Sequence, residues 1–489
     1  MSKNNLIQLY DSSAKVKQIG DSLQLHGQKI HLNGLIGSSL SFVVQSLFKK
    51  SEFPFLVVLN DKEEAAYYLN DLEQMVGEED VLFYPGSYRR PYQIEDTDNA
   101  NVLLRAEVLN RINSRKKPAV VVTYPEALFE KVVTKKELDK NTLKVAVGDQ
   151  ISIEFINEVL FEYEFKRVDF ITEPGEFSVR GGIIDVFSFS NDNPYRIEFF
   201  GNEVDSIRSF DVETQLSIEK QKKIAIIPNV ENKFFQENRE SFLDYIHQNT
   251  IVFIQNTELL ISKLEKLFDK ADDIFKNLNA TIKHVPPEKI FLHQKEFLKK
   301  ALDFTVVELS SKPTFNIAKA FDFHIQPQPS FNKQFDLLLN NLNDNHFNGY
   351  KNYLFCSSGA QEKRFHDIFE SLDEANHESI RKQYHTVVFP LYQGFIDEEN
   401  QIACYTDHQI FERYHKFSIK NGYSKKQTIT LKELNTLAVG DYVTHIDHGI
   451  GKFGGLQKIQ VEGKTQEAIK LVYADNDIVY VSIHSLHKI

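Results

Sequence analysis

The run from residue 165 to residue 211 constrains the fold of this chain more than any other segment. A Pro-Gly turn precedes Phe177, Ser178, Val179 and Arg180, and this alternation of apolar and polar residues has the period of a half-buried strand. A second run, 195–200, stops at a Gly-Asn dipeptide and then resumes, as in a β-hairpin with a two-residue turn. The segment is therefore predicted to form antiparallel sheet.

The polar face of this predicted sheet is a candidate binding surface. It would carry Arg167, Glu176 and Arg180, and Phe177 would add an aromatic anchor. Flat surfaces with arginine and aromatic anchors are typical of protein docking sites. The alternative is that the arginines only solvate an outer face, and periodicity alone favours that alternative.

The order of residues in this segment resembles a known family. The sequence RVDFITEPGEFSVRGGIIDVF, followed by PYRIEFFGNEVDSIRSFD, is similar to the UvrB-like region of the bacterial transcription-repair coupling factors (Mfd). In that family the region recruits the excision-repair protein UvrA. The resemblance implies that Arg167, Phe177 and Arg180 bind UvrA, with Glu176 on the same predicted face.

A segment near the N-terminus has the position of a phosphate-binding loop but not its residues. A working loop has the spacing GxxxxGK[ST], in which glycines wrap the phosphates, lysine neutralises them and the hydroxyl holds magnesium. Aligned on Gly34, and with Gly37 inside the loop, the later positions are Ser39, Leu40 and Ser41. Leucine cannot neutralise a triphosphate. We expect a degenerate loop, a plain strand-to-helix turn that binds no nucleotide.

The pattern of strands and helices predicts several domains in the 489 residues. Residues 1–132 alternate strands with helices, which predicts a parallel α/β sheet. A β-rich insertion is expected at 133–215, after which residues 216–325 would complete a doubly wound, UvrB-like α/β domain. Residues 330–425 are predicted to form a small α/β domain whose role the sequence leaves unclear.

The last sixty or so residues carry a second signature. The sequence VGDYVTHIDHGIGKFGG resembles the opening of a CarD-like, RNA-polymerase-interacting domain, expected at 433–489. Short strands and frequent glycines predict a small Tudor or SH3-like barrel. In that family an edge strand binds the β subunit of RNA polymerase, and the matching strand here is 467–473. The resemblance implies contacts by Glu467, Ile469, Lys470 and Leu471, although at least one apolar residue of the pair should belong to the barrel core.

Composition excludes several other functions. With 57 basic and 69 acidic residues the formal charge is −12, so the chain alone is expected to bind DNA only weakly. Cys356 and Cys404 are too few for a disulfide framework or a cysteine zinc site, which favours a reducing cytoplasm. The longest apolar runs are too short to span a membrane. His445 and His448 lack a third metal ligand, and no catalytic triad stands out, so neither a metal nor catalysis is expected.

The resemblance covers essentially the whole chain and implies what would follow it. The family's translocase motor, which uses ATP and magnesium, would come after Ile489, so the chain is expected to be an N-terminal portion without cofactors. We therefore expect a non-catalytic recruitment platform that links RNA polymerase to UvrA. Two alternatives stay open: a nucleotide-dependent repair helicase, and a transcription regulator that acts through the C-terminal barrel alone.

Overall fold

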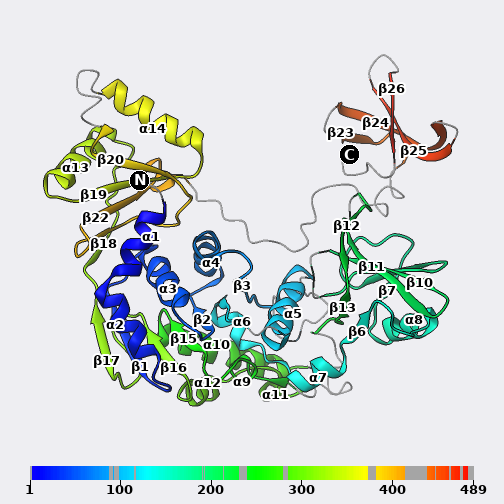
Figure 1. The fold of residues 1–489 in the computed structure, drawn as a ribbon, viewed down its shortest axis with the longest axis horizontal. Helices are drawn as coiled ribbons and strands as arrows, with labels where there is room; N and C mark the ends of the chain where they lie inside the picture. Colours follow the sequence, from blue (N-terminus) through cyan, green and yellow to red (C-terminus); the bar gives the residue numbers. More distant parts are fainter. Residues whose placement is uncertain are drawn as a thin grey trace. The chain divides into compact units, whose positions relative to one another are not determined.

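The structure is a computed structural model, and it falls into two units. Residues 1–135 and 231–419 form the first unit, and residues 136–230 and 420–489 form the second (Figure 1). The residues that the structure describes are 3–87, 92, 99–114, 117–189, 191, 193–212, 214–230, 239–278, 285–372, 381–413, 438–445, 448–461, 464–473 and 477–482. Within these ranges, no helix has the length and apolar character that a membrane crossing requires.

A parallel sheet of seven strands forms the centre of the first unit. Its order is β17 (Lys319–Asp322), β1 (Lys29–Asn33), β16 (Thr305–Glu308), β15 (Ile251–Ile254), β2 (Phe55–Val58), β4 (Val120–Thr123) and β3 (Val81–Phe83). The central strands β2 and β15 are apolar at every position and fully buried. Such continuous apolar runs are typical of parallel strands that are covered on both faces. The predicted parallel α/β sheet is confirmed.

Helices connect these strands, and side-chain caps define where several of them begin. The Asp61 carboxylate accepts a hydrogen bond from the Glu64 N–H at the start of α4, and Asn256 accepts one from Leu259 at the start of α10. The connecting elements are α1 (Lys3–Ser12), α2 (Ala14–Leu23), α3 (Ser39–Lys49), α4 (Lys62–Val76), α5 (Asn99–Ser114), α6 (Pro125–Phe129), α9 (Phe242–Tyr245), α10 (Thr257–Lys276), α11 (Pro287–Ile290) and α12 (Gln294–Ala301), with β5 (Val132–Val133) paired to β14 (Arg239–Glu240).

A smaller five-stranded sheet completes the first unit, and we call it the small α/β domain. Its order is β18 (Ile325–Pro327), β21 (Phe395–Asp397), β22 (Ile402–Thr406), β19 (Lys351–Cys356) and β20 (Tyr384–Val388), with helices α13 (Phe335–Phe347), α14 (Gly359–Leu372) and α16 (Asp407–Ile410). Leu338, Leu354, Phe365 and Tyr405 lie in its core. The domain begins with β18, before the predicted start at 330, because β18 pairs with β21. The predicted limits at 425 and 433 lie outside the described residues.

The β-rich region contains a sheet of six strands (Figure 1, green). The order is β12 (Ser217–Gln221), β11 (Glu203–Phe210), β10 (Tyr195–Phe200), β9 (Ile183–Val186), β8 (Glu176–Arg180) and β7 (Lys166–Arg167); the region also holds α7 (Lys135–Lys140), α8 (Ile153–Glu162) and the antiparallel pair β6 (Leu143–Ala146) and β13 (Lys223–Ile226). The predicted hairpin is confirmed, because β10 pairs with β11 across Gly201 and Asn202.

The structure places the end of the β-rich region later than residue 215. Strand β12 pairs with β11, and β13 pairs with β6, so residues 217–226 do not return to the parallel sheet as expected. The second unit accordingly includes the chain up to residue 230.

Four antiparallel strands form the C-terminal sheet. They follow one another in chain order as β23 (Tyr442–His445), β24 (Gly449–Val461), β25 (Lys464–Val472) and β26 (Ile478–Ser482). Val443, Phe453, Ile469, Leu471 and Val481 pack together as its core. The four-stranded arrangement agrees with the expected β architecture, and closure into a Tudor or SH3-like barrel stays a prediction.

Candidate functional site

A row of polar side chains crosses one face of the six-stranded sheet. The strand register aligns Ser178 with Asp185, Asp185 with Arg196, Arg196 with Arg208, and Arg208 with Lys220. Direct cross-strand partners point to the same face of a sheet. These five residues therefore form a continuous row from β8 to β12, which we call the charged row.

Asp185 is the electrostatic centre of the charged row. Its side chain is 2% exposed and forms ion pairs with both Arg180 and Arg196. The pair with Arg196 is bidentate, with Nε 2.7 Å from Oδ1 and Nη2 2.9 Å from Oδ2. This hydrogen bonding raises the pKa of the Arg196 guanidinium. One carboxylate thus fixes two guanidinium groups that come from different strands.

Aromatic rings support the arginines of the same face. The guanidinium of Arg180 lies 5.3 Å from the ring centre of Phe170, and that of Arg196 lies 4.5 Å from the ring centre of Phe210. Both distances are within the range of a cation–π interaction. The rings and the shared carboxylate hold the guanidinium planes in defined orientations, which lowers the entropy lost when such a surface binds a partner.

The charged row is locally basic although the chain is acidic. Together with Arg180 it carries four cations (Arg180, Arg196, Arg208 and Lys220) and one anion, Asp185, and Arg208 also pairs with Glu198 of β10. Arg180 keeps 43% of its side chain exposed and Lys220 is exposed, whereas Arg196 is largely covered. The exposed cations can meet an acidic partner, while Arg196 orients Asp185 beneath them.

Two of the predicted UvrA-binding residues are buried, which corrects the expectation that they face a partner. Phe177 is 0% exposed, and its ring packs edge-on against Phe161 of α8 at 5.2 Å. The buried carboxylate of Glu176 accepts hydrogen bonds from the backbone N–H groups of Thr172 and Glu173, at 2.8 and 3.0 Å. Phe177 is therefore a core residue, and Glu176 shapes the turn before β8.

The two predicted arginines are both exposed, but the sheet does not bring them to one face. Arg167 lies on β7, where the register pairs it with Phe177. Arg180 is three residues beyond Phe177 in β8 and therefore points to the opposite face. The expectation that Arg167 and Arg180 share one polar face is wrong for this reason.

Sequence reasoning missed Asp185, Arg196 and Arg208. All three lie inside the segment 165–211, and Arg196 and Arg208 alternate with buried Ile197 and Ile207. That alternation was a usable signal for an outward face. The strand register, which aligns them in one row, could not be obtained from the alternation alone.

The C-terminal sheet places the predicted polymerase contacts differently from expectation. Ile469 and Leu471 are both fully buried in its core, so neither can be a surface contact. Strand β25 pairs with β24 on one side and, over residues 468–472, with β26 on the other. It is therefore not an edge strand there. Lys470 is half-buried on the opposite face, and Glu467 pairs in register with Lys458.

Apolar side chains are exposed on the opposite face of this sheet. Tyr442 and Ile450 on β23 and β24, and Ile478 and Tyr480 on β26, all keep large exposed areas. Exposed aromatic and aliphatic groups of this kind are more typical of protein interfaces than of a plain solvated surface.

The degenerate phosphate loop is filled by protein contacts. Ser39, at the start of α3, exchanges hydrogen bonds with the backbone of Ile36, and Leu40 is buried. The hydroxyl of Ser41, where magnesium would be held, donates instead to Asp71 at 3.3 Å. These contacts leave the remaining hydroxyls engaged with the protein.

Asp71 makes this region sensitive to pH. Burial raises the pKa of its carboxyl group to about 7, although hydrogen bonds from Ser38, the Tyr392 backbone and Ser41 oppose the rise. Because the pKa of this carboxyl group is higher in the folded state than in the unfolded state, the group contributes stability that is fully present below its unfolded-state pKa. This stability is lost as the pH rises towards 7. The Asp71→Asn variant should lack this loss, which has a slope of up to about 1.4 kcal/mol per pH unit. Urea titrations of both proteins between pH 4 and 8 would measure the difference, and parallel pH profiles would contradict the assignment.

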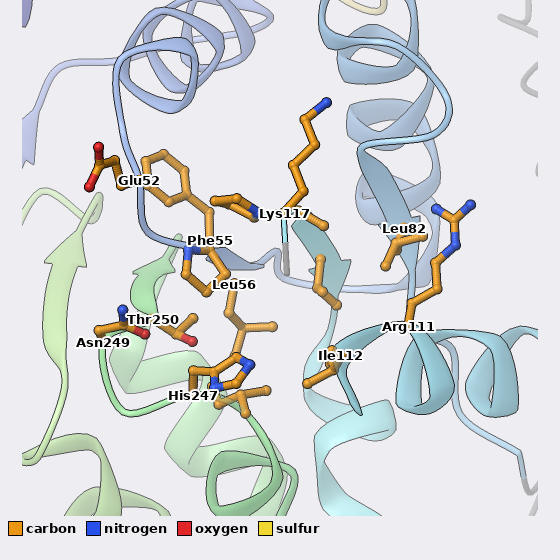
Figure 2. Close-up of a pocket in the computed structure, with 15 residues that line it drawn as sticks. Glu52, Phe55, Leu56, Leu82, Arg111, Ile112, Lys117, His247, Asn249 and Thr250 are labelled. Atoms are coloured by element: carbon orange, nitrogen blue, oxygen red, sulfur yellow. The ribbon is translucent and has the colours of Figure 1, made fainter. Parts of the chain in front are cut away.

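A separate pocket of about 360 Å³ lies at the amino ends of β2 and β4. Figure 2 shows Phe55, Leu56 and Leu82 at this pocket, with His247 and Thr250 beside them. Ligands of open parallel sheets bind at the carboxyl ends of the strands. None of the predicted site residues lines this pocket, so it takes no part in the candidate site.

His445 and His448, whose spacing could suit a metal ion, lie close together. The rings of His445 and His448 lie 4.7 Å apart, and His445 is buried. Among the residues that the structure describes, no group of three or more potential ligands comes together.

Two known domain families match the regions of the chain that carry these surfaces. A UvrB interaction domain matches residues 143–232, and a CarD-like/TRCF RID domain matches residues 437–489. The chain therefore carries one domain of each kind, and the first match includes the whole charged row.

Individual relatives carry a more particular name. The chain is similar to the transcription-repair-coupling factors of Bacillus subtilis (24% identity over 94% of the chain and 44% of the relative), Rickettsia bellii (24%, 92% and 44%) and Escherichia coli (22%, 95% and 45%). The predicted resemblance to the N-terminal portion of these factors is confirmed. The chain spans less than half the length of these relatives.

Proposed function

We propose that this chain is the non-catalytic recruitment part of a transcription-repair coupling factor, which bridges RNA polymerase and UvrA. The observation that carries this proposal is the presence of both matched domains in one chain that aligns with such factors over 92% to 95% of its length. Joining two binding modules raises the effective concentration of one partner near the other. Recruitment of this kind needs no chemical step in the chain.

The UvrA-binding surface in this proposal is the exposed part of the charged row together with Arg180. Arg180, Arg208 and Lys220 would contact acidic groups of UvrA, and Asp185 and Arg196 would orient them. Support comes from the shared carboxylate and the ring contacts, which pre-organise the guanidinium groups. Arg167 stays a separate candidate on the opposite face.

The polymerase-binding surface is the C-terminal sheet, with the β subunit as its partner. Since β25 is internal over residues 468–472, strand addition would use β23 or β26. Lys470 stays a candidate contact, supported by its position opposite the core residues Ile469 and Leu471. We further infer a doubly wound, UvrB-like topology for the first α/β domain and a Tudor-like barrel at the C-terminus.

A bridging experiment tests this function directly. RNA polymerase is immobilised, the chain is added, and UvrA is added last; we expect UvrA to be retained only when the chain is present. Retention of the chain without UvrA would instead support the transcription regulator. Heat released on titration with ATP and magnesium would support the nucleotide-dependent helicase, whereas we expect none.

Removing two arginines should separate binding from folding. The double variant Arg180→Ala/Arg208→Ala should weaken UvrA binding at least about tenfold, because truncating an arginine at the centre of an interface costs about 2 kcal/mol or more. Biolayer interferometry against immobilised UvrA would measure the affinity, and circular dichroism would verify the fold. Arg364→Ala is the matched control, because Arg364 packs over Phe411 in the small α/β domain. Unchanged affinity of the double variant would show that UvrA binds another surface.

A further inference from the structure

The segment 390–394 of the small α/β domain lies against the degenerate phosphate loop. The Ser38 N–H donates to the Gln393 carbonyl at 3.2 Å, and the Gln393 N–H donates to the Ser38 hydroxyl at 2.9 Å. The Tyr392 N–H donates to the Asp71 carboxylate at 3.0 Å. Backbone groups from a segment more than 300 residues away thus meet the N-cap of α3, where a phosphate loop would hold its ligand, and Asp71 of α4.

Aromatic stacking reinforces these backbone contacts. The rings of Tyr67 on α4 and Tyr392 are nearly parallel, with ring centres 4.0 Å apart and planes 7° apart. One turn into α3, Phe42 meets Phe395 edge-on at 5.9 Å. Both pairs join the parallel-sheet domain to the small α/β domain.

The glycines of the degenerate loop are explained by this packing. A Cβ atom at Gly34 would clash with the backbone oxygen of Phe323, and one at Gly37 would lie 3.0 Å from the oxygen of Gly394. Both glycines also have positive φ angles, of +82° and +58°. The small α/β domain therefore crowds Gly37, whereas Gly34 is crowded by Phe323, which directly follows β17 of the parallel sheet; both positions favour glycine without any phosphate.

Charged and polar side chains continue the contact beyond the loop. The Tyr10 hydroxyl donates to Asp397 at 2.7 Å, and both groups are buried. Lys15 of α2 pairs with Glu399 at 2.5 Å, and His324 contacts the same carboxylate at 2.8 Å. Helices α1 and α2 of the parallel-sheet domain, in addition to the loop, therefore hold the turn between β21 and β22.

We propose that the degenerate phosphate loop is a docking socket for residues 390–394, and that filling this socket is the role of the small α/β domain. The filled socket joins the small α/β domain to the parallel sheet and occupies the position at which a nucleotide phosphate would bind. This inference does not depend on the binding of UvrA or RNA polymerase.

A double-mutant cycle on the stacked tyrosines tests the socket in the 489-residue chain. Tyr67→Ala and Tyr392→Ala should each accelerate amide exchange, both in residues 38–42 and in residues 389–394. The acceleration of exchange in the double variant should be smaller than the product of the accelerations in the two single variants. It should fall short of that product by a factor of about two to ten, because the stacked pair contributes about 0.5–1.5 kcal/mol beyond the burial of each ring. Tyr392→Phe keeps the ring and should accelerate exchange less than Tyr392→Ala.

Two controls make the outcome decisive. Phe347→Ala removes an exposed aromatic ring from the same small α/β domain and should leave both segments unchanged. Independent, multiplicative effects of the two tyrosine variants, or faster exchange in 389–394 without any change in 38–42, would overturn the socket. Addition of ATP and magnesium to the wild type should not alter exchange, and faster exchange of 389–394 on addition would show that nucleotide displaces the segment and would also overturn the proposal.

Discussion

Replacing Phe177 by alanine should lower the free energy of unfolding of the β-rich region by about 3–5 kcal/mol, the usual cost of deleting a buried aromatic ring. The ring is completely buried and packs against Phe161 of α8, so the substitution leaves a cavity between the sheet and the helix. The chain contains no tryptophan. Scanning calorimetry and amide exchange across residues 176–210 are therefore the suitable measurements.

An exposed phenylalanine of the same sheet supplies the control for this prediction. Phe200, at the end of β10, is 83% exposed, and Phe200→Ala should change the stability little. If Phe177→Ala were as stable as the wild type and lost only UvrA binding, the ring would be a direct contact and its placement in the core would be wrong.

Replacing Ile469 by arginine should unfold the C-terminal sheet and abolish polymerase binding for that reason. Ile469 is fully buried among Val443, Phe453 and Leu471, and an unpaired charge in such a core costs several kcal/mol. Amide exchange in β23 to β26 should become fast, and polymerase binding measured by interferometry should disappear with it.

The matched variant places the same charge on the outer face. Ile450 of β24 is 68% exposed, so Ile450→Arg should leave the sheet folded. A folded Ile469→Arg sheet that had lost only its polymerase affinity would contradict the burial of Ile469. Loss of affinity in a folded Ile450→Arg variant would instead locate the polymerase on the outer face.

Local signals in the sequence predicted the local elements well. The hairpin of β10 and β11 forms around Gly201 because turn chemistry and alternation act within a few residues. The sheet that β13 joins could not be predicted in this way. A short apolar run such as 224–226 suits either sheet, and only its pairing with β6, some eighty residues earlier, decides which one it joins.

Burial explains most of the differences at the candidate site. Alternation distinguishes the two faces of a strand, but it does not show which neighbouring element covers each face. Helix α8 covers the side of Phe177, and the turn at Thr172 encloses Glu176. The resemblance to the coupling factors pointed to a segment that lies within the matched UvrB interaction domain, whereas the accessible residues of that segment depended on contacts that form only in the folded chain.

The glycines beside β1 have a consequence for how nucleotide-dependent enzymes are identified. Because a methyl group at Gly34 has no room next to the Phe323 oxygen, every protein that shares this packing needs glycine there, whether or not it consumes ATP. Glycines at a strand-to-helix junction can therefore reflect close packing against a neighbouring main chain instead of phosphate binding. The lysine that neutralises the phosphates is the residue that distinguishes a nucleotide-binding loop from such a turn, and this chain has Leu40 at that position.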